Sequence, residues 1–392
     1  MEKIIISLFF IFLVLFPFGQ LTKIPLTFLN SPDIHLYLTD VILFFLVLTW
    51  GLWGIFNKKK RYQLPPLAKP IFLFSFLAGL SLVVNSPLFS GREVGVGFLY
   101  LLRWIFYAGL YFLLFDLKKK LKWLNWKNIR CFLIIIGSAV GIFGLIQYFL
   151  WPNLKALEVL QYDPHFYRVV GTFLDPGFTG IILVFTLLLI IGRWFEEKKK
   201  WLILLSLVIY SALALTYSRA SWLGFFGAMS LLSFYKKSWK LFLLIISVLV
   251  LTWFLIPQPL GEGGKLTRTY TIQARFENVQ QATKIIKQKP LFGVGFNTLR
   301  YYQRDQGFLS QEEWQINQAG AGIDNSWLFV LATTGAFGFL SYLWLWGRAL
   351  KESKKKIIVL VSLLALFIHS FFLNSLFYPQ IMTWIWILLV FV

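Results

Sequence analysis

Long apolar runs, separated by short polar segments, repeat along almost the whole chain. A helix needs about 20 mostly apolar residues to cross the hydrocarbon core of a bilayer. Only helices or closed barrels satisfy their backbone groups in lipid, and these runs lack the polar alternation of barrel strands. The pattern therefore predicts an all-α polytopic membrane protein with about 12 transmembrane helices. The expected spans are residues 4–18, 36–56, 70–86, 97–115, 130–150, 178–193, 201–216, 220–235, 240–256, 326–347, 357–376 and 378–392.

Every second connection between these runs is rich in lysine. Such segments mark the cytoplasmic side of a membrane. We therefore expect the chain in the inner membrane, with both termini in the cytoplasm. The net charge of +21 is then a signal of topology and of contact with membrane lipids, and it does not indicate a nucleic-acid partner. The lysine-rich connections are residues 57–61, 117–123, 193–200, 235–240 and 347–356.

Composition removes several kinds of chemistry. The one cysteine, Cys131, excludes an internal disulfide and a cysteine metal cluster. The three histidines are far apart in sequence, so no HExxH-type zinc site exists, and no phosphate-binding loop of the GxxxxGK[ST] type occurs. We therefore expect neither a metal nor any other cofactor. Because no small-x-small cleavage site follows the first apolar run, we expect that run to remain as the first helix.

The alternation leaves three extracytoplasmic segments of interest, at residues 152–177, 216–221 and 257–325. The third is much longer than the other connections, and such loops tend to carry function. Part of it is expected to be helical, with an apolar stripe that lies on the outer membrane surface. The stripe comprises Ile272, Phe276, Val279, Thr283 and Ile286. The chain divides into an N-terminal helix array (1–160), a segment with the Ser-Arg turn (161–256), the large loop (257–325) and the C-terminal helices (326–392).

Three arginines are predicted at this extracytoplasmic face. Arg219 stands between two apolar runs in "TYSRAS", Arg168 precedes the sixth expected span, and Arg275 lies on the border of the loop helix's apolar stripe. A guanidinium is always charged and offers a planar fork that matches phosphate oxygens. The set would suit a lipid-linked diphosphate. Alternatively, Arg219 extends from a helix end to the headgroups, and the other two are solvated surface charges.

Two further motifs lie in the large loop. In "AGIDNSWLFV", Asp324 and Asn325 stand directly before an expected span. They either cap this helix, or the Asp324 carboxylate acts as a general base for an acceptor hydroxyl. Gly293 and Gly295 in "PLFGVGF" do not complete a dinucleotide fingerprint, and we expect a tight turn there.

Four motifs occur in one order along the second half of the chain: "RVVGTFLDPGFTG", "LALTYSRASWLG", "ARFENVQQATKIIKQKPLFGVG" and "DNSWLFVLATTGAFG". Together they resemble the O-antigen ligase and O-antigen polymerase family, over roughly residues 165–346. The resemblance implies a GT-C-like helix arrangement. It also implies transfer of a glycan from an undecaprenyl-diphosphate carrier to an acceptor glycan or glycolipid at the outer face of the cytoplasmic membrane.

The resemblance also assigns roles to residues. Arg219 and Arg275 match the family's diphosphate-binding arginines, and Asp324 with Asn325 stands where the family usually has a His-Asn pair that activates the acceptor. The carboxylate in place of an imidazole favours a polymerase, or a ligase with a different acceptor. Two more arginines are candidates for substrate binding. These are Arg103, which alternatively is an interfacial residue of the fourth span, and Arg300.

A different class of protein remains open, namely a secondary transporter or a flippase for lipid-linked oligosaccharides. Transporters usually show internal repeats and ionisable residues near the bilayer midplane. We find no repeat between the halves of this chain, and most of the candidate charges are expected at the outer interface. A scaffold in envelope assembly is a third possibility.

Overall fold

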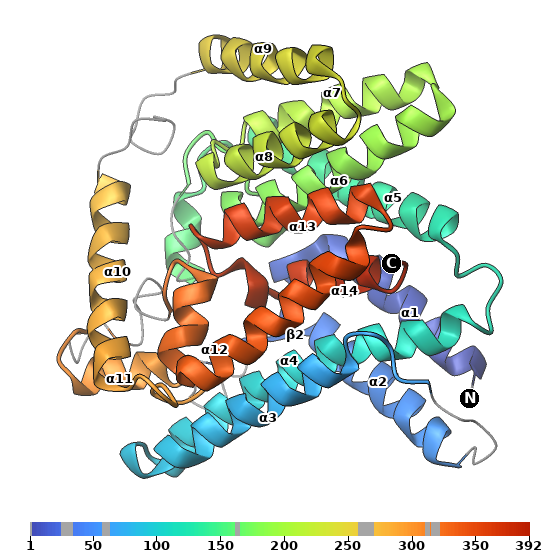
Figure 1. The fold of residues 1–392 in the computed structure, drawn as a ribbon. Helices are drawn as coiled ribbons and strands as arrows, with labels where there is room; N and C mark the ends of the chain where they lie inside the picture. The colour runs from blue at the N-terminus through green and yellow to red at the C-terminus, as the bar shows by residue number, and fades with distance from the viewer. Residues whose placement is uncertain are drawn as a thin grey trace.

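The computed structural model of the chain describes residues 2–24, 34–56, 63–160, 165–257, 270–309, 314 and 322–392. These residues are almost entirely helical, with one small antiparallel pair of strands, β1 (Lys23–Ile24) and β2 (Leu36–Tyr37) (Figure 1). The α-helices are α1 (Glu2–Leu15), α2 (Leu38–Phe56), α3 (Ala68–Asn85), α4 (Gly91–Lys118), α5 (Trp126–Leu150), α6 (Pro176–Glu197), α7 (Lys200–Ala214), α8 (Arg219–Tyr235), α9 (Trp239–Leu255), α10 (Tyr270–Gln288), α11 (Leu299–Asp305), α12 (Ser326–Ser353), α13 (Ile357–Ser370) and α14 (Pro379–Leu389). Short 3-10 turns are η1 (Phe16–Thr22), η3 (Ser86–Leu88), η4 (Lys155–Leu160), η5 (Gly171–Phe173) and η8 (Ser375–Phe377).

Seven segments in the described part of the chain are long and apolar enough to cross a membrane: Glu2–Thr22, Leu38–Phe56, Ala68–Leu88, Gly91–Lys118, Trp126–Leu150, Pro176–Glu197 and Ser326–Ser353. Four shorter apolar helices, α7, α9, α13 and α14, accompany them. The all-α polytopic membrane class is therefore confirmed. Each of the twelve expected spans overlaps one of the helices α1 to α9 and α12 to α14, while the number that crosses the bilayer remains a prediction.

The centre of the fold lies around α6. In its apolar window 72% of the residues are buried, against 17% for α2. A helix that is apolar on all sides, as "GIILVFTLLLIIG" is, is expected to be covered on every side. The exposed apolar side chains of α2, including Phe44, Phe45 and Leu48, instead suit contact with lipid. The helices that pack around α6 thus fix the position of the chain segments at the two ends of α6.

The long loop contributes α10 and α11, and α10 stands apart from most of the helices in Figure 1. The residues by which α10 packs on the rest of the protein are Ala282 and Ile285, both buried. Of the predicted apolar stripe, Phe276 and Val279 are exposed, while the side chain of Ile272 lies outside the described residues. Ile286, at the end of the predicted stripe, is partly buried and packs with Ala282 and Ile285. Contact of the exposed part of the stripe with the membrane remains a prediction.

After α10 the backbone turns sharply and joins α12. Gly293 and Gly295 both have positive φ, as expected for a tight turn. The N–H groups of Val294 and Gly295 donate to the carbonyls of Ala332 and Thr333, which a non-helical residue, Gly335, frees inside α12. A Cβ atom at Gly335 would lie only 2.2 Å from the Leu291 carbonyl oxygen. The glycines therefore allow the loop to be joined to α12 by backbone hydrogen bonds.

Candidate functional site

Arg219 is the first residue of α8. The preceding Ser218 caps the helix, because its hydroxyl accepts a hydrogen bond from the N–H of Ser221 at 3.3 Å. Tyr217 takes a positive φ just before this cap, so the chain turns sharply between α7 and α8. This turn places Arg219, which is half-buried, at the N-terminus of α8.

Arg275, on α10, lies near Arg219 although 56 positions separate the two in sequence. Burial and the positive charge of Arg275 both lower the pKa of the Arg219 guanidinium. An arginine stays protonated even so, since its ordinary pKa is above 12. Among the residues that the structure describes, no carboxylate forms an ion pair with Arg275. Two like charges thus lie close together, which favours an anion between them.

Arg168 is buried beside the same turn. Its Nε donates to the carbonyl of Thr216 at 2.9 Å, and the N–H of Val169 donates to Leu215 at 2.8 Å. The segment before α6 therefore lies alongside the residues that lead into Arg219. These hydrogen bonds tie Arg168 to the turn that precedes Arg219.

A buried histidine connects three of the helices at this site. His369, at the end of α13, has no exposed surface; its Nε2 lies 3.1 Å from the Gly177 carbonyl and its Nδ1 lies 2.6 Å from the Ser375 hydroxyl. The same Gly177 carbonyl accepts a hydrogen bond from Ser221 at 3.3 Å, and Ser221 contacts the cap Ser218 at 2.9 Å. These bonds tie the starts of α6 and α8 to the end of α13.

Sequence reasoning missed His369. Arg275 is close enough to His369 for an electrostatic interaction, so this residue belongs to the same site as the two arginines. Its partners are a backbone carbonyl and a serine, neither of which leaves a recognisable motif. The sequence signal that could have pointed to His369 is its position in the second half of an expected span, toward the side expected to be extracytoplasmic, where Arg219 is also expected.

Asp324 and Asn325 lie where α12 begins, next to α10. The Asn325 side chain caps α12 and accepts from the N–H groups of Trp327 and Leu328 at 2.9 and 3.0 Å. The backbone N–H of Asp324 donates at 3.0 Å to Asn278, which is on α10 three residues after Arg275. The side-chain cap is therefore provided by Asn325, and the backbone of the exposed Asp324 contacts α10 at Asn278, about one helical turn beyond Arg275.

The last two candidates, Arg103 and Arg300, lie on α4 and α11. Arg103, on α4, forms an ion pair with Asp40 at 2.8 Å and also donates to the carbonyl of His35. Its guanidinium lies 4.8 Å from the centre of the Tyr100 ring. Arg300 is on α11, the short helix that follows the turn at Gly293 and Gly295. Within those same residues, no three His, Cys, Asp or Glu side chains are grouped closely enough to hold a metal ion.

Comparison with known protein families finds a match over about a third of the chain. Residues 201–343 match the family model described as O-Antigen ligase, which confirms the resemblance found in the sequence. The match runs from α7 into α12 and includes Arg219, Arg275, Arg300, Asp324 and Asn325, whereas Arg103 and Arg168 lie outside it. No curated protein matches the chain.

Proposed function

Because residues 201–343 carry the O-antigen ligase domain, we propose that the chain transfers a glycan from an undecaprenyl-diphosphate carrier to a glycan or glycolipid hydroxyl. The reaction takes place at the extracytoplasmic face of the inner membrane, with both termini in the cytoplasm. The proposal covers both a polymerase, whose acceptor is another carrier-linked unit, and a ligase, whose acceptor is a different molecule.

The observation that carries this proposal is the closeness of Arg219 and Arg275. When the anomeric C–O bond to the carrier breaks, negative charge builds on the diphosphate that leaves. Two fixed guanidinium groups stabilise that charge in the transition state more than in the ground state, which is the condition for catalysis. They require no metal ion for this task. The N-terminus of α8, where Arg219 lies, adds the favourable end of a helix dipole.

Asp324 is the proposed base for the acceptor. The acceptor oxygen attacks the anomeric carbon, its proton passes to the Asp324 carboxylate, and the diphosphate leaves with the bonding electron pair. A direct displacement of this kind inverts the anomeric centre. The exposed Asp324 lies beside α10, near enough to the arginine-bearing turn for an acceptor to reach both groups. Asn325 and Arg168 have supporting roles, because they fix the start of α12 and the turn before α8.

Replacement of each arginine tests the proposal. Membranes that contain Arg219→Ala or Arg275→Ala are expected to transfer glycan from a lipid-linked donor at least about 100-fold more slowly than the native protein. A matched control is Arg92→Ala, which removes an exposed arginine at the outer end of α4. Normal transfer in both site variants, at normal protein levels, would reject the diphosphate role.

Deletion of the gene distinguishes the remaining functions. A surface polymer reduced to one repeat indicates a polymerase, and a full-length polymer left on its carrier indicates a ligase. Unchanged glycans would instead favour the transporter alternative. The arginine variants are then measured in the same cells, so that loss of transfer and loss of protein are separated.

A further inference from the structure

Three cations from three separate elements meet at the opposite, lysine-rich end of the helices. They are Lys118 at the end of α4, Arg130 in α5 and Lys356 immediately before α13. Lys356 is close enough to Lys118 and Arg130 for both positive charges to act on it. Because these residues lie far apart in the chain, their closeness is produced by the fold and not by a run of lysines.

Two aromatic rings lie among these cations. The Lys356 ammonium is 4.4 Å from the centre of the Trp126 ring and 5.7 Å from that of Phe391. Arg130 lies 5.9 Å from the Trp126 ring, and Lys118 lies 5.1 Å from the Phe391 ring. The two ring centres are 6.1 Å apart. The cations thus surround one aromatic pair, and ring faces hold a cation without neutralising it.

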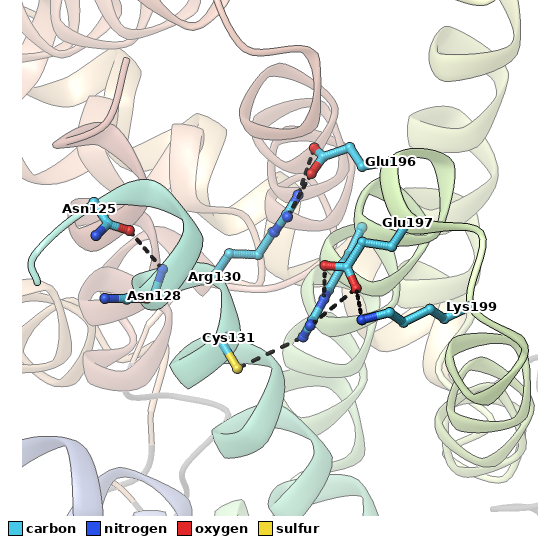
Figure 2. Close-up of polar contacts among 8 residues, drawn as sticks. Asn125, Asn128, Arg130, Cys131, Glu196, Glu197 and Lys199 are labelled. Atoms are coloured by element: carbon cyan, nitrogen blue, oxygen red, sulfur yellow. Dashed lines mark hydrogen bonds and ion pairs between the residues drawn. The ribbon is translucent and has the colours of Figure 1, made fainter.

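The nearby carboxylates already have partners. Figure 2 shows Arg130 held by both oxygens of Glu196, at 2.7 Å each, while Glu197 contacts Arg193 and Lys199. On the neighbouring turns, Asp116 pairs with Lys120, and Glu352 pairs with Lys355 and Arg348. No carboxylate within the described ranges forms an ion pair with Lys118 or Lys356. Among the three cations, Arg130 is therefore the one that forms an ion pair with a carboxylate, Glu196, within the described residues.

The cost of this arrangement is visible at Lys356, which lies outside the expected spans. Burial and the charges of Lys118 and Arg130 lower the pKa of its ammonium to about 8. An anion placed among the cations would remove the repulsion and stabilise the charged form of each lysine.

We propose that Lys118, Arg130 and Lys356 form a binding site for the phosphate group of an anionic membrane lipid. The lipid belongs to the leaflet at the lysine-rich end, which is the cytoplasmic leaflet in the proposed topology. Basic pockets between membrane helices on this side are suited to anionic headgroups. The Trp126 and Phe391 rings favour a lipid over a free phosphate ion, because rings of this kind sit at the headgroup level of a bilayer.

The site does not depend on the proposed transferase activity. It joins α4 and α5 from the first half of the chain to the turn between α12 and α13 in the second half. A bound phosphate would bridge these elements at the end of the molecule opposite to Arg219. Its expected effect is therefore on stability and lipid binding, and not on the chemistry of glycan transfer.

Lipid binding to the purified full chain tests the inference. We expect phosphatidylglycerol, but not phosphatidylcholine, to be retained in native mass spectra and to raise the melting temperature in detergent. Lys356→Met and Lys118→Met are each expected to weaken phosphatidylglycerol binding about fivefold, since one lysine near an anionic surface contributes on the order of 1 kcal/mol. Lys354→Met is the matched control, because Lys354 is exposed and two residues from Lys356.

Two results would overturn the site. One is equal phosphatidylglycerol affinity in Lys356→Met, Lys118→Met and Lys354→Met, which would indicate a diffuse attraction to the whole basic face. The other is a rise in melting temperature with inorganic phosphate that matches the effect of the lipid, which would assign the site to a free anion. Removing Lys356 relieves repulsion, so the lipid-free variant is expected to melt no lower than the native protein. Lys118→Met gives the same test if Lys356→Met does not fold.

Discussion

Arg103 and Arg219 are both single arginines flanked by apolar sequence, yet their charged surroundings in the fold differ. Arg103 has a dedicated carboxylate, Asp40, whose other oxygen accepts from the Tyr107 hydroxyl at 2.8 Å. Arg219 lies close enough to a second arginine, Arg275, for the two positive charges to interact. One arginine is in a buried ion pair within the protein, whereas the other feels the charge of a second cation.

This difference separates a structural arginine from one that is suited to a ligand. A buried ion pair satisfies itself and holds α2 against α4, so it offers little to an incoming anion. Two like charges raise the free energy of the empty site, and an anionic substrate lowers it again. The environment of an arginine is thus a better guide to its role than its presence in an apolar run.

The strongest way to break the comparison is to replace the neighbouring cation, Arg275, by a carboxylate. Arg275→Glu should create a pair like that of Arg103 and Asp40, with transfer reduced more than about 100-fold and a raised melting temperature. Initial rates and thermal unfolding in detergent measure the two effects. Arg275→Gln, which removes the charge without supplying a new one, is the control for stability. A Glu variant that still transfers glycan would show that the charge pair is not the donor site.

Replacement of Asp324 tests whether this carboxylate acts as the base for the acceptor hydroxyl. Asp324→Asn keeps the shape of the side chain and loses its basicity, so we expect transfer about 100-fold slower with an unchanged melting temperature. Asn325→Ala should do the reverse, with about 1 kcal/mol of stability lost through the cap. Normal rates in Asp324→Asn would leave Asp324 without a catalytic role.

The Arg103 pair predicts a stability effect without a catalytic one. Asp40→Leu leaves a partly buried guanidinium without its carboxylate, and we expect about 2–3 kcal/mol of lost stability. The double variant Asp40→Leu/Arg103→Leu should recover most of that loss. Thermal unfolding measures the stability, and the transfer rate per folded molecule should stay close to native. A specific loss of donor binding in the double variant would return Arg103 to the substrate site.

The smallest expected effect concerns the alignment of α8. His369→Leu removes the hydrogen bonds to Gly177 and Ser375, and a small shift of Arg219 should slow transfer about tenfold. His369→Gln can donate to the same carbonyl and should restore most of the rate. Because donor concentration can be varied, a lower rate at saturating donor separates a misplaced group from a protein that has lost its fold. Equal rates in Leu and Gln variants would contradict this role.

The helices were predictable from sequence because apolar length and lysine-rich turns are physical requirements of a bilayer. The approach of Arg275 to Arg219 was predicted from their shared extracytoplasmic face and from the family resemblance, but its geometry was not, since 56 residues of loop and helix separate them. The pairing of Arg103 with Asp40 was missed, although both are charges inside expected spans. His369 was missed because one of its two partners is a backbone carbonyl, which every residue possesses.

The exposed and buried faces of α10 show a similar limit. Spacing alone selected Phe276 and Val279 as the apolar face, whereas Ala282 and Ile285 make the contact. Helical periodicity locates a stripe, but it does not say which of two surfaces that stripe meets. A small residue such as Ala282 carries little weight in a hydropathy pattern, yet it allows close helix packing.

The backbone seam between the large loop and α12 has a consequence for how the protein is made. The Ser81 hydroxyl of α3 contacts the carbonyls of Phe292 and Thr333, so the seam unites an early helix with a late one. A ribosome delivers these segments some 250 residues apart. The backbone bonds of the seam can form only after α12 has been synthesised, so we expect the loop to reach its final position late in biosynthesis.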